Sequence, residues 1–124
     1  MAAHTVRLGT PEPVAWLIRE GEVLAALEVA EGRWARARGL LGRDGIDGAL
    51  LLQPARSVHT VGMRFPIDVA FCDGDLRVLH IVCPMARYRL GVPRIRARMV
   101  IEAEAGAFER WRLRPGDQLE IKGR

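Results

Sequence analysis

The chain has 124 residues, of which 49% are hydrophobic and 27% charged, and its formal net charge is +4. This length favours a single domain over residues 1–124 that buries an ordinary core without disulfide staples. No run approaches the roughly 20 apolar residues of a membrane helix. The segment Met1–Arg7 also lacks the basic region and apolar core of a signal peptide. We therefore expect a cytoplasmic protein with no membrane partner.

The basic residues extend from Arg7 to Arg124, and Lys122 is the only lysine. A sequence pI of about 10.0 leaves a nucleic-acid-associated protein as one alternative. Because dispersed charge makes no focused field, we favour a solvated basic surface over a nucleic-acid partner.

Apolar runs separated by turn signals predict about eight short strands. In chain order they are Thr5–Leu8, Val14–Ile18, Val23–Val29, Ala49–Gln53, Ile67–Cys72, Leu76–Cys83, Arg94–Ile101 and Gln118–Ile121. Gly21, within Arg19–Glu22, predicts a hairpin between the second and third strands. The sequence Asp73-Gly74-Asp75 predicts another hairpin. If that second loop has three residues, Asp68 faces His80.

Two segments have helical patterns. Ala30–Leu41 places Trp34, Ala37 and Leu41 on one face and predicts the principal helix. Ala107–Leu113 predicts a short helical turn, reached through the segment 102–106. With no repeating βα units, the pattern predicts a mainly β (α+β) fold. We expect an antiparallel β-sandwich or barrel-like domain with one principal helix packed on it.

Cys72 and Cys83 lie in apolar segments, and two cysteines are too few for a disulfide framework. Their predicted strand positions also lie beyond disulfide reach. We interpret both as buried structural thiols. Neither they nor the histidines and methionines have diagnostic metal-ligand spacing, so the sequence predicts no metal and no cofactor.

The stretch Ser57–Asp68 is the most chemically loaded part of the chain. It carries His59, Thr60 and Arg64 together with Met63 and Asp68, and Gly62 and Pro66 bend the backbone between them. Apolar strands flank it on both sides. We therefore expect this stretch in the middle of the fold, with Pro84–Pro93 as an irregular loop further on.

The chain resembles domain-of-unknown-function family 192 over roughly residues 28–121. The resemblance is carried by Arg38–Arg43, Gly48–Leu52 and Val58–Phe71, and further on by Val100–Gly106 and Gly116-Asp117. It implies a compact, mostly β fold with a sandwich or barrel-like core. It implies no particular chemistry.

Three classes of function remain open. We favour a non-catalytic module that binds a small polar or anionic ligand around residues 57–68, through His59, Thr60, Met63, Arg64 and Asp68. Arg64 can hold an anion through its planar guanidinium, or it can pair with Asp68. The alternatives are a small hydrolase-like enzyme that uses His59 and Asp68, and the nucleic-acid-associated protein above. Whether the chain is an enzyme, and its oligomeric state, stay undecided.

Overall fold

The computed structural model of the protein describes residues 15–30, 32, 39–40, 42–55, 63–85 and 95–123. Within these ranges it has seven strands and one helix, α2 (Ala107–Trp111). The strands are β1 (Ala15–Arg19), β2 (Glu22–Ala30), β3 (Ala49–Leu52), β4 (Ile67–Cys72), β5 (Val78–Met85), β6 (Met99–Glu104) and β7 (Glu120–Gly123). No described helix is long and apolar enough to cross a membrane.

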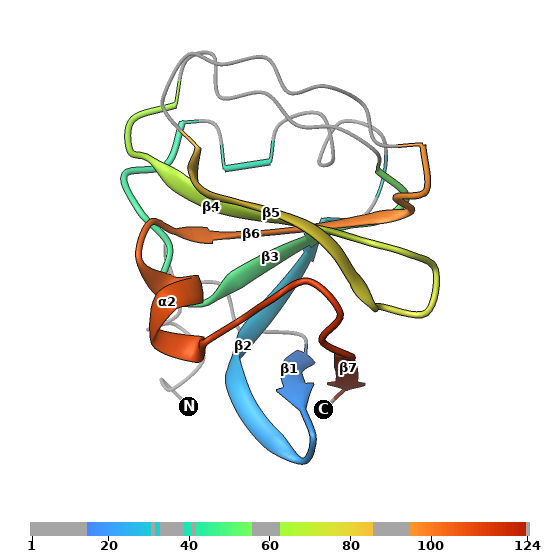
Figure 1. Ribbon diagram of the computed structural model, residues 1–124. Helices are drawn as coiled ribbons and strands as arrows, with labels where there is room; N and C mark the ends of the chain where they lie inside the picture. The colour runs from blue at the N-terminus through green and yellow to red at the C-terminus, as the bar shows by residue number, and fades with distance from the viewer. Residues whose placement is uncertain are drawn as a thin grey trace, which may run out of the picture.

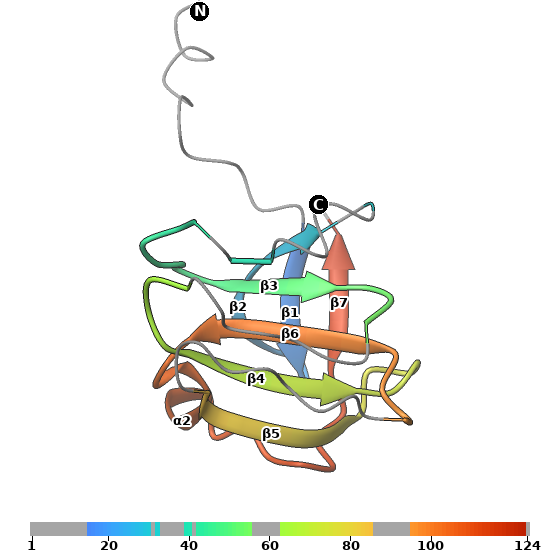
Figure 2. The ribbon, with the colours of Figure 1, turned by 90° about the horizontal axis from the view of Figure 1, so that it is seen from above.

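The strands form one mixed sheet in the order β5-β4-β6-β3-β2-β1-β7. Among the pairs of described strands, β2–β3 alone is parallel, and the other five are antiparallel. Figure 2 shows β1 and β7 crossing the direction of β3, β6, β4 and β5, so the sheet curls back on itself. This confirms the predicted mainly β, sandwich or barrel-like architecture.

The two ends of the sheet approach each other without pairing as strands. An isolated bridge joins Arg77, just before β5, to Gln118, just before β7. Beside it, the amide of Val78 donates to the carbonyl of Asp117 at 2.9 Å, and the amide of Gly116 donates to the carbonyl of Val78 at 2.7 Å. The sheet is therefore barrel-like but open.

Two apolar cores lie on the two faces of this sheet. The helix-side core is Ala15, Leu17, Leu27, Ala49, Leu51, Ala70, Cys72, Val78, Ile101, Ala103, Ala107, Phe108, Leu113 and Leu119. The loop-side core is Ala30, Leu40, Ile46, Leu50, Leu52, Met63, Phe65, Ile67, Val69, Phe71, Ala97 and Val100. Figure 1 shows α2 on one side of β3, β6 and β4, and the teal segment 42–48 on the other. The central strands are thus buried on both faces.

Both predicted hairpins are present. β1 and β2 are joined through Glu20 and Gly21, whose φ angles are 49° and 81°. Two positive φ angles in succession define the tight hairpin turn that Gly favours. In the β4–β5 hairpin, Asp73 Oδ1 accepts hydrogen bonds from the amides of Asp75 and Arg77 at 2.8 and 3.0 Å.

The register of the β4–β5 hairpin differs from the one expected. His80 faces Phe71 and not Asp68, and the register shifts between Phe71 and Cys72. The amide of Asp73 donates to the carbonyl of Arg77 at 3.0 Å, and the carbonyl of Asp73 accepts from the amide of Leu76 at 3.1 Å, so the loop begins after Asp73. The predicted contact between Asp68 and His80 is therefore wrong.

Three further expectations need correction. β6 continues through Glu102 to Glu104, where the sequence suggested a lead into a helical turn, because Glu102 and Ala103 pair with both neighbouring strands. β5 includes Pro84, which was assigned to a loop. Cys72 is buried as expected, but Cys83 is exposed; both thiols are free.

The principal helix predicted over Ala30–Leu41 falls mostly outside the described residues. Ala30 ends β2, and Gly39 and Leu40 lie in a turn. The predicted strand Thr5–Leu8 lies wholly outside them. The described helix is α2, which confirms the helical turn expected at this point of the sequence.

Candidate functional site

The structure describes the predicted stretch Ser57–Asp68 from residue 63 onward, and this part packs into the loop-side core. Met63 and Phe65 are buried, at 3% and 9% exposure, and Ile67 opens β4 beside them. His59 and Thr60 lie outside the described residues, so their predicted roles stay predictions. Met63 serves as a core residue here.

Arg64 is exposed, and its partner is Asp44. Its Nη1 lies 2.9 Å from Asp44 Oδ1, and the two side chains are 60% and 87% exposed. The ion pair with Asp68 that the sequence left open is therefore not formed. Exposed pairs contribute about 0–1 kcal/mol to stability, so little energy holds the Arg64 guanidinium in place.

Asp68 anchors the helix. Its side chain is 1% exposed, and Oδ2 accepts hydrogen bonds from the amides of Gly106 and Phe108, each at 3.0 Å. These amides belong to the first turn of α2, which the carboxylate ties to β4. Burial raises the pKa of Asp68, and the two amide hydrogen bonds oppose that rise. This predicted site residue thus faces the helix side of the sheet.

Glu102 is the buried acid of the opposite face. It is paired with Leu50 on β3 and Val69 on β4, and both of these belong to the loop-side core. Residues paired across a ladder project to the same face. The Glu102 side chain therefore enters an apolar layer, where it is 4% exposed and its Oε1 atom has no hydrogen-bond partner among the described residues.

The same row of the sheet carries a second acid, Glu28, which is paired with Leu50 in the parallel β2–β3 ladder. Glu28 has a partner: Arg43 binds it through two hydrogen bonds, at 3.0 and 2.9 Å. Such bidentate pairs are the strong form of this interaction. The hydrogen bonds of Arg43 are therefore directed to Glu28, and only its charge acts on Glu102.

The environment of Glu102 sets its ionisation. Burial raises the pKa of Glu102 to about 7, and the nearby charge of Arg43 only partly opposes that rise. Gly39 approaches closely: a Cβ built on it would lie 3.1 Å from Glu102 Oε1. A carboxyl with a pKa near neutral can accept or donate a hydrogen bond at physiological pH.

Sequence reasoning missed Glu102 as a site residue. The available signal was a single acid inside the apolar run Met99–Ala103, within a segment that carries the family resemblance. The signal can be recognised only when β6 is known to pair with both β3 and β4. Without that knowledge, an acid at this position suggests the end of a strand.

Among the residues that the structure describes, no group of three or more His, Cys, Asp or Glu side chains is arranged to hold a metal ion. His80 makes a tilted ring contact with Phe71, with the ring centroids 6.1 Å apart.

Comparison with known proteins agrees with the predicted resemblance. The model of the family DUF192, described as an uncharacterized ACR, matches residues 16–121. A UPF0127 protein of Pyrococcus horikoshii is 29% identical over 106 residues, which cover 82% of this chain and 88% of the relative.

Two crystal structures share the fold. A protein of unknown function from Novosphingobium aromaticivorans superposes with a TM-score of 0.77 at 21% identity, covering 91% of this chain and 89% of the other. A Sinorhizobium meliloti protein described as a "putative transcription regulator" gives 0.76 at 21% identity, covering 91% and 98%. At this identity the likeness shows the fold alone.

Proposed function

The chain belongs to the DUF192 family, and we propose that it is a non-catalytic module that binds a small polar or anionic ligand on the loop side of the sheet, around residues 57–68. The observation that carries the proposal is the buried Oε1 of Glu102, which has no hydrogen-bond partner in the part of the chain that the structure describes. Leaving a buried polar atom unsatisfied costs about 1–3 kcal/mol. A ligand that donates a hydrogen bond to this atom would recover that cost.

The neighbours of Glu102 support this location. Met63 and Phe65, from the described end of the stretch, pack into the same loop-side core as Leu50 and Val69, which flank Glu102. Arg64 is held only by an exposed pair and can turn to the anionic group of a ligand. A ligand with one donor and one anionic group would use both residues.

The hydrolase-like alternative requires Asp68 to orient His59. The Oδ2 atom of Asp68 already accepts two amide hydrogen bonds from α2, and its side chain belongs to the opposite face of the sheet. This arrangement favours binding over catalysis by these two residues. A hydrolytic activity that disappears in His59→Ala would reverse the preference.

A nucleic-acid function is the second alternative, and the name of the Sinorhizobium meliloti structure gives a reason to test it. Arg19, Arg43 and Arg64 are each paired with an acid, which weakens the field that a phosphate backbone needs. Duplex binding that weakens steeply with salt would support this alternative against ours.

The test of the proposal is a thermal-shift screen of small polar and anionic metabolites on the full chain, at pH 6 and pH 8. A ligand at about 100 times its Kd adds about 2.7 kcal/mol of stability, which raises the Tm by several degrees. Hits are then measured on Glu102→Gln, Arg64→Ala and His59→Ala, each relative to its own ligand-free Tm. We expect these variants to lose most of the ligand-induced shift.

Two variants serve as matched controls because they change the same residue types elsewhere on the surface. Glu120→Gln lies on β7, and Arg114→Ala lies in the turn before it; both side chains are exposed. They should keep the full shift. A screen without hits, or hits that bind Glu102→Gln and Arg64→Ala as well as the wild type, would contradict the proposal.

A further inference from the structure

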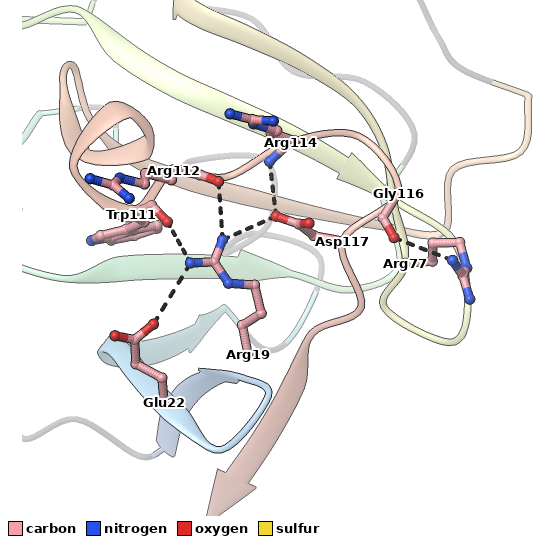
Figure 3. Close-up of polar contacts among 8 residues, drawn as sticks. All are labelled: Arg19, Glu22, Arg77, Trp111, Arg112, Arg114, Gly116 and Asp117. Atoms are coloured by element: carbon pink, nitrogen blue, oxygen red, sulfur yellow. Dashed lines mark hydrogen bonds and ion pairs between the residues drawn. The ribbon is translucent and has the colours of Figure 1, made fainter.

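A second polar cluster lies on the other side of the molecule, at the end of α2. Arg19, the last residue of β1, points at this helix end (Figure 3). Its Nη2 donates to the carbonyl of Trp111 at 2.6 Å, and Nη1 donates to the carbonyl of Arg112 at 3.1 Å. Nη1 also lies 3.0 Å from Asp117 Oδ2. Arg19 thereby fixes the β1–β2 turn against the end of the helix.

A cleft of about 400 Å³ lies between this turn and the helix end; its lining residues are Arg19, Glu22, Val23, Leu24, Arg110, Trp111 and Arg112. Leu24 and Trp111 pack against the helix-side core, and the ring of Trp111 lies 5.4 Å from that of Phe108. The lining of the cleft is mainly polar, and the helix-side core supports its apolar residues Leu24 and Trp111. Its volume is within the range of small-molecule sites, about 300–1,000 Å³.

The charges around the cleft are unbalanced. Three arginines and one glutamate line it. The glutamate, Glu22, lies 3.7 Å from Arg19, which also pairs with Asp117. Arg110 and Arg112 are exposed, and within the described part of the chain their side chains form no hydrogen bond or ion pair. The charge of Arg110 acts on Asp68, which is buried beneath the helix, and lowers the pKa of that carboxyl.

We propose that this cleft binds a small anion with a planar ring, whose phosphate or carboxylate contacts Arg110 and Arg112 and whose ring lies against Trp111. Guanidinium groups match the planar, two-oxygen geometry of these anions. An indole supplies a flat apolar surface for a ring. The site is separate from the one proposed around Glu102, since it lies on the helix side of the sheet.

The experiment is isothermal titration calorimetry of the full chain with adenosine monophosphate, adenosine and inorganic phosphate. Because the ring and the anion each contribute, adenosine monophosphate should bind at least about tenfold more tightly than either fragment. The double variant Arg110→Gln/Arg112→Gln should weaken its binding by about tenfold or more. Trp111→Phe should reduce its advantage over inorganic phosphate.

Arg114→Gln is the matched control. It removes the same charge from a neighbouring exposed residue that does not line the cleft (Figure 3), and it should change the affinity by less than about twofold. Absent binding, equal affinity for adenosine monophosphate and phosphate, or an equal loss in Arg114→Gln would overturn the proposal. Binding that survives the double variant but is lost in Glu102→Gln would place this ligand on the loop side and would also overturn it.

Discussion

Within the described ranges, each face of the sheet buries one carboxylate, and the two lie at neighbouring positions of the β4–β6 ladder. Asp68 is paired with Ala103 and projects to the helix side, while Glu102 is paired with Val69 and projects to the loop side. Both are nearly inaccessible, at 1% and 4% exposure. Among the described residues, each has one buried oxygen without a hydrogen-bond partner, Asp68 Oδ1 and Glu102 Oε1, but Asp68 Oδ2 accepts two backbone hydrogen bonds.

This difference separates two uses of a buried acid. Burial raises the pKa of Asp68 too, but its two hydrogen bonds oppose that rise and hold a helix in place, which is a structural role. The charge of Arg43 only partly opposes the effect of burial on Glu102, whose pKa rises to about 7. Burial alone does not distinguish the two residues; the count of hydrogen bonds does.

The largest effect should come from Asp68→Ala. The substitution removes two hydrogen bonds to a charged group, each contributing about 1.5–3 kcal/mol, and leaves the amides of Gly106 and Phe108 without their acceptor. We expect the free energy of unfolding to fall by about 4 kcal/mol, measured by urea denaturation.

Two further variants qualify this result. Asp68→Asn keeps an acceptor oxygen and should lose clearly less stability than Asp68→Ala. Asp75→Ala removes an exposed aspartate from the β4–β5 loop and should change stability by less than about 0.5 kcal/mol. If Asp68→Ala costs no more than Asp75→Ala, the helix-anchoring role is wrong.

At high pH, Glu102→Gln should increase the free energy of unfolding, whereas Asp68→Ala should decrease it. The pKa of Glu102 rises from 4.5 to about 7 on folding, so the folded state binds more protons than the unfolded state between these values. Stability from this group is therefore lost as pH increases from about 4.5 to about 7. The loss is about 3 kcal/mol, from about 1.4 kcal/mol for each unit of pKa shift.

The measurement is the free energy of unfolding of wild type and Glu102→Gln at intervals between pH 5 and pH 8. The variant lacks the titrating group, so its free energy of unfolding should increase relative to that of the wild type as pH rises. At pH 8 it should be the more stable protein. Glu120→Gln, on the exposed surface of β7, should follow the wild type throughout. Parallel curves for wild type and Glu102→Gln would show that Glu102 titrates normally.

Local signals in the sequence were sufficient for much of the fold. The β1–β2 hairpin follows from Gly21 between two apolar runs, and α2 follows from its own short segment. The family resemblance, the mainly β class and the burial of Cys72 were also predicted and are confirmed. Each depends on residues close together in the chain or on a motif of contiguous residues.

The candidate site was harder to predict because it depends on pairing between distant segments. The partner of Arg64 is Asp44, 20 positions away, and the amides that bind Asp68 lie 38 and 40 positions away. The position of Glu102 depends on the register of β6 with both β3 and β4. Strands buried on both faces show no alternation of polar and apolar residues, so their register leaves little trace in the sequence.

The smallest expected effect is that of Gly39→Ala, which tests the close approach of Gly39 to Glu102. Gly39 has a φ of 52°, and a Cβ there would lie 3.1 Å from Glu102 Oε1. Gly39→Ala should therefore cost about 1 kcal/mol for the left-handed backbone and somewhat more for the contact. Gly32→Ala is the matched control, because Gly32 has a φ of 84° and open space around its Cβ position.

A double-mutant cycle with Glu102→Ala isolates the contact from the backbone cost. Removing the carboxyl should make Gly39→Ala cheaper by about 0.5 kcal/mol or more and leave the cost of Gly32→Ala unchanged. Equal costs in both backgrounds would mean that the Glu102 carboxyl moves away from Gly39 at no cost. That outcome would give Glu102 the freedom to find a partner within the protein, and the contrast with Asp68 would lose its main support.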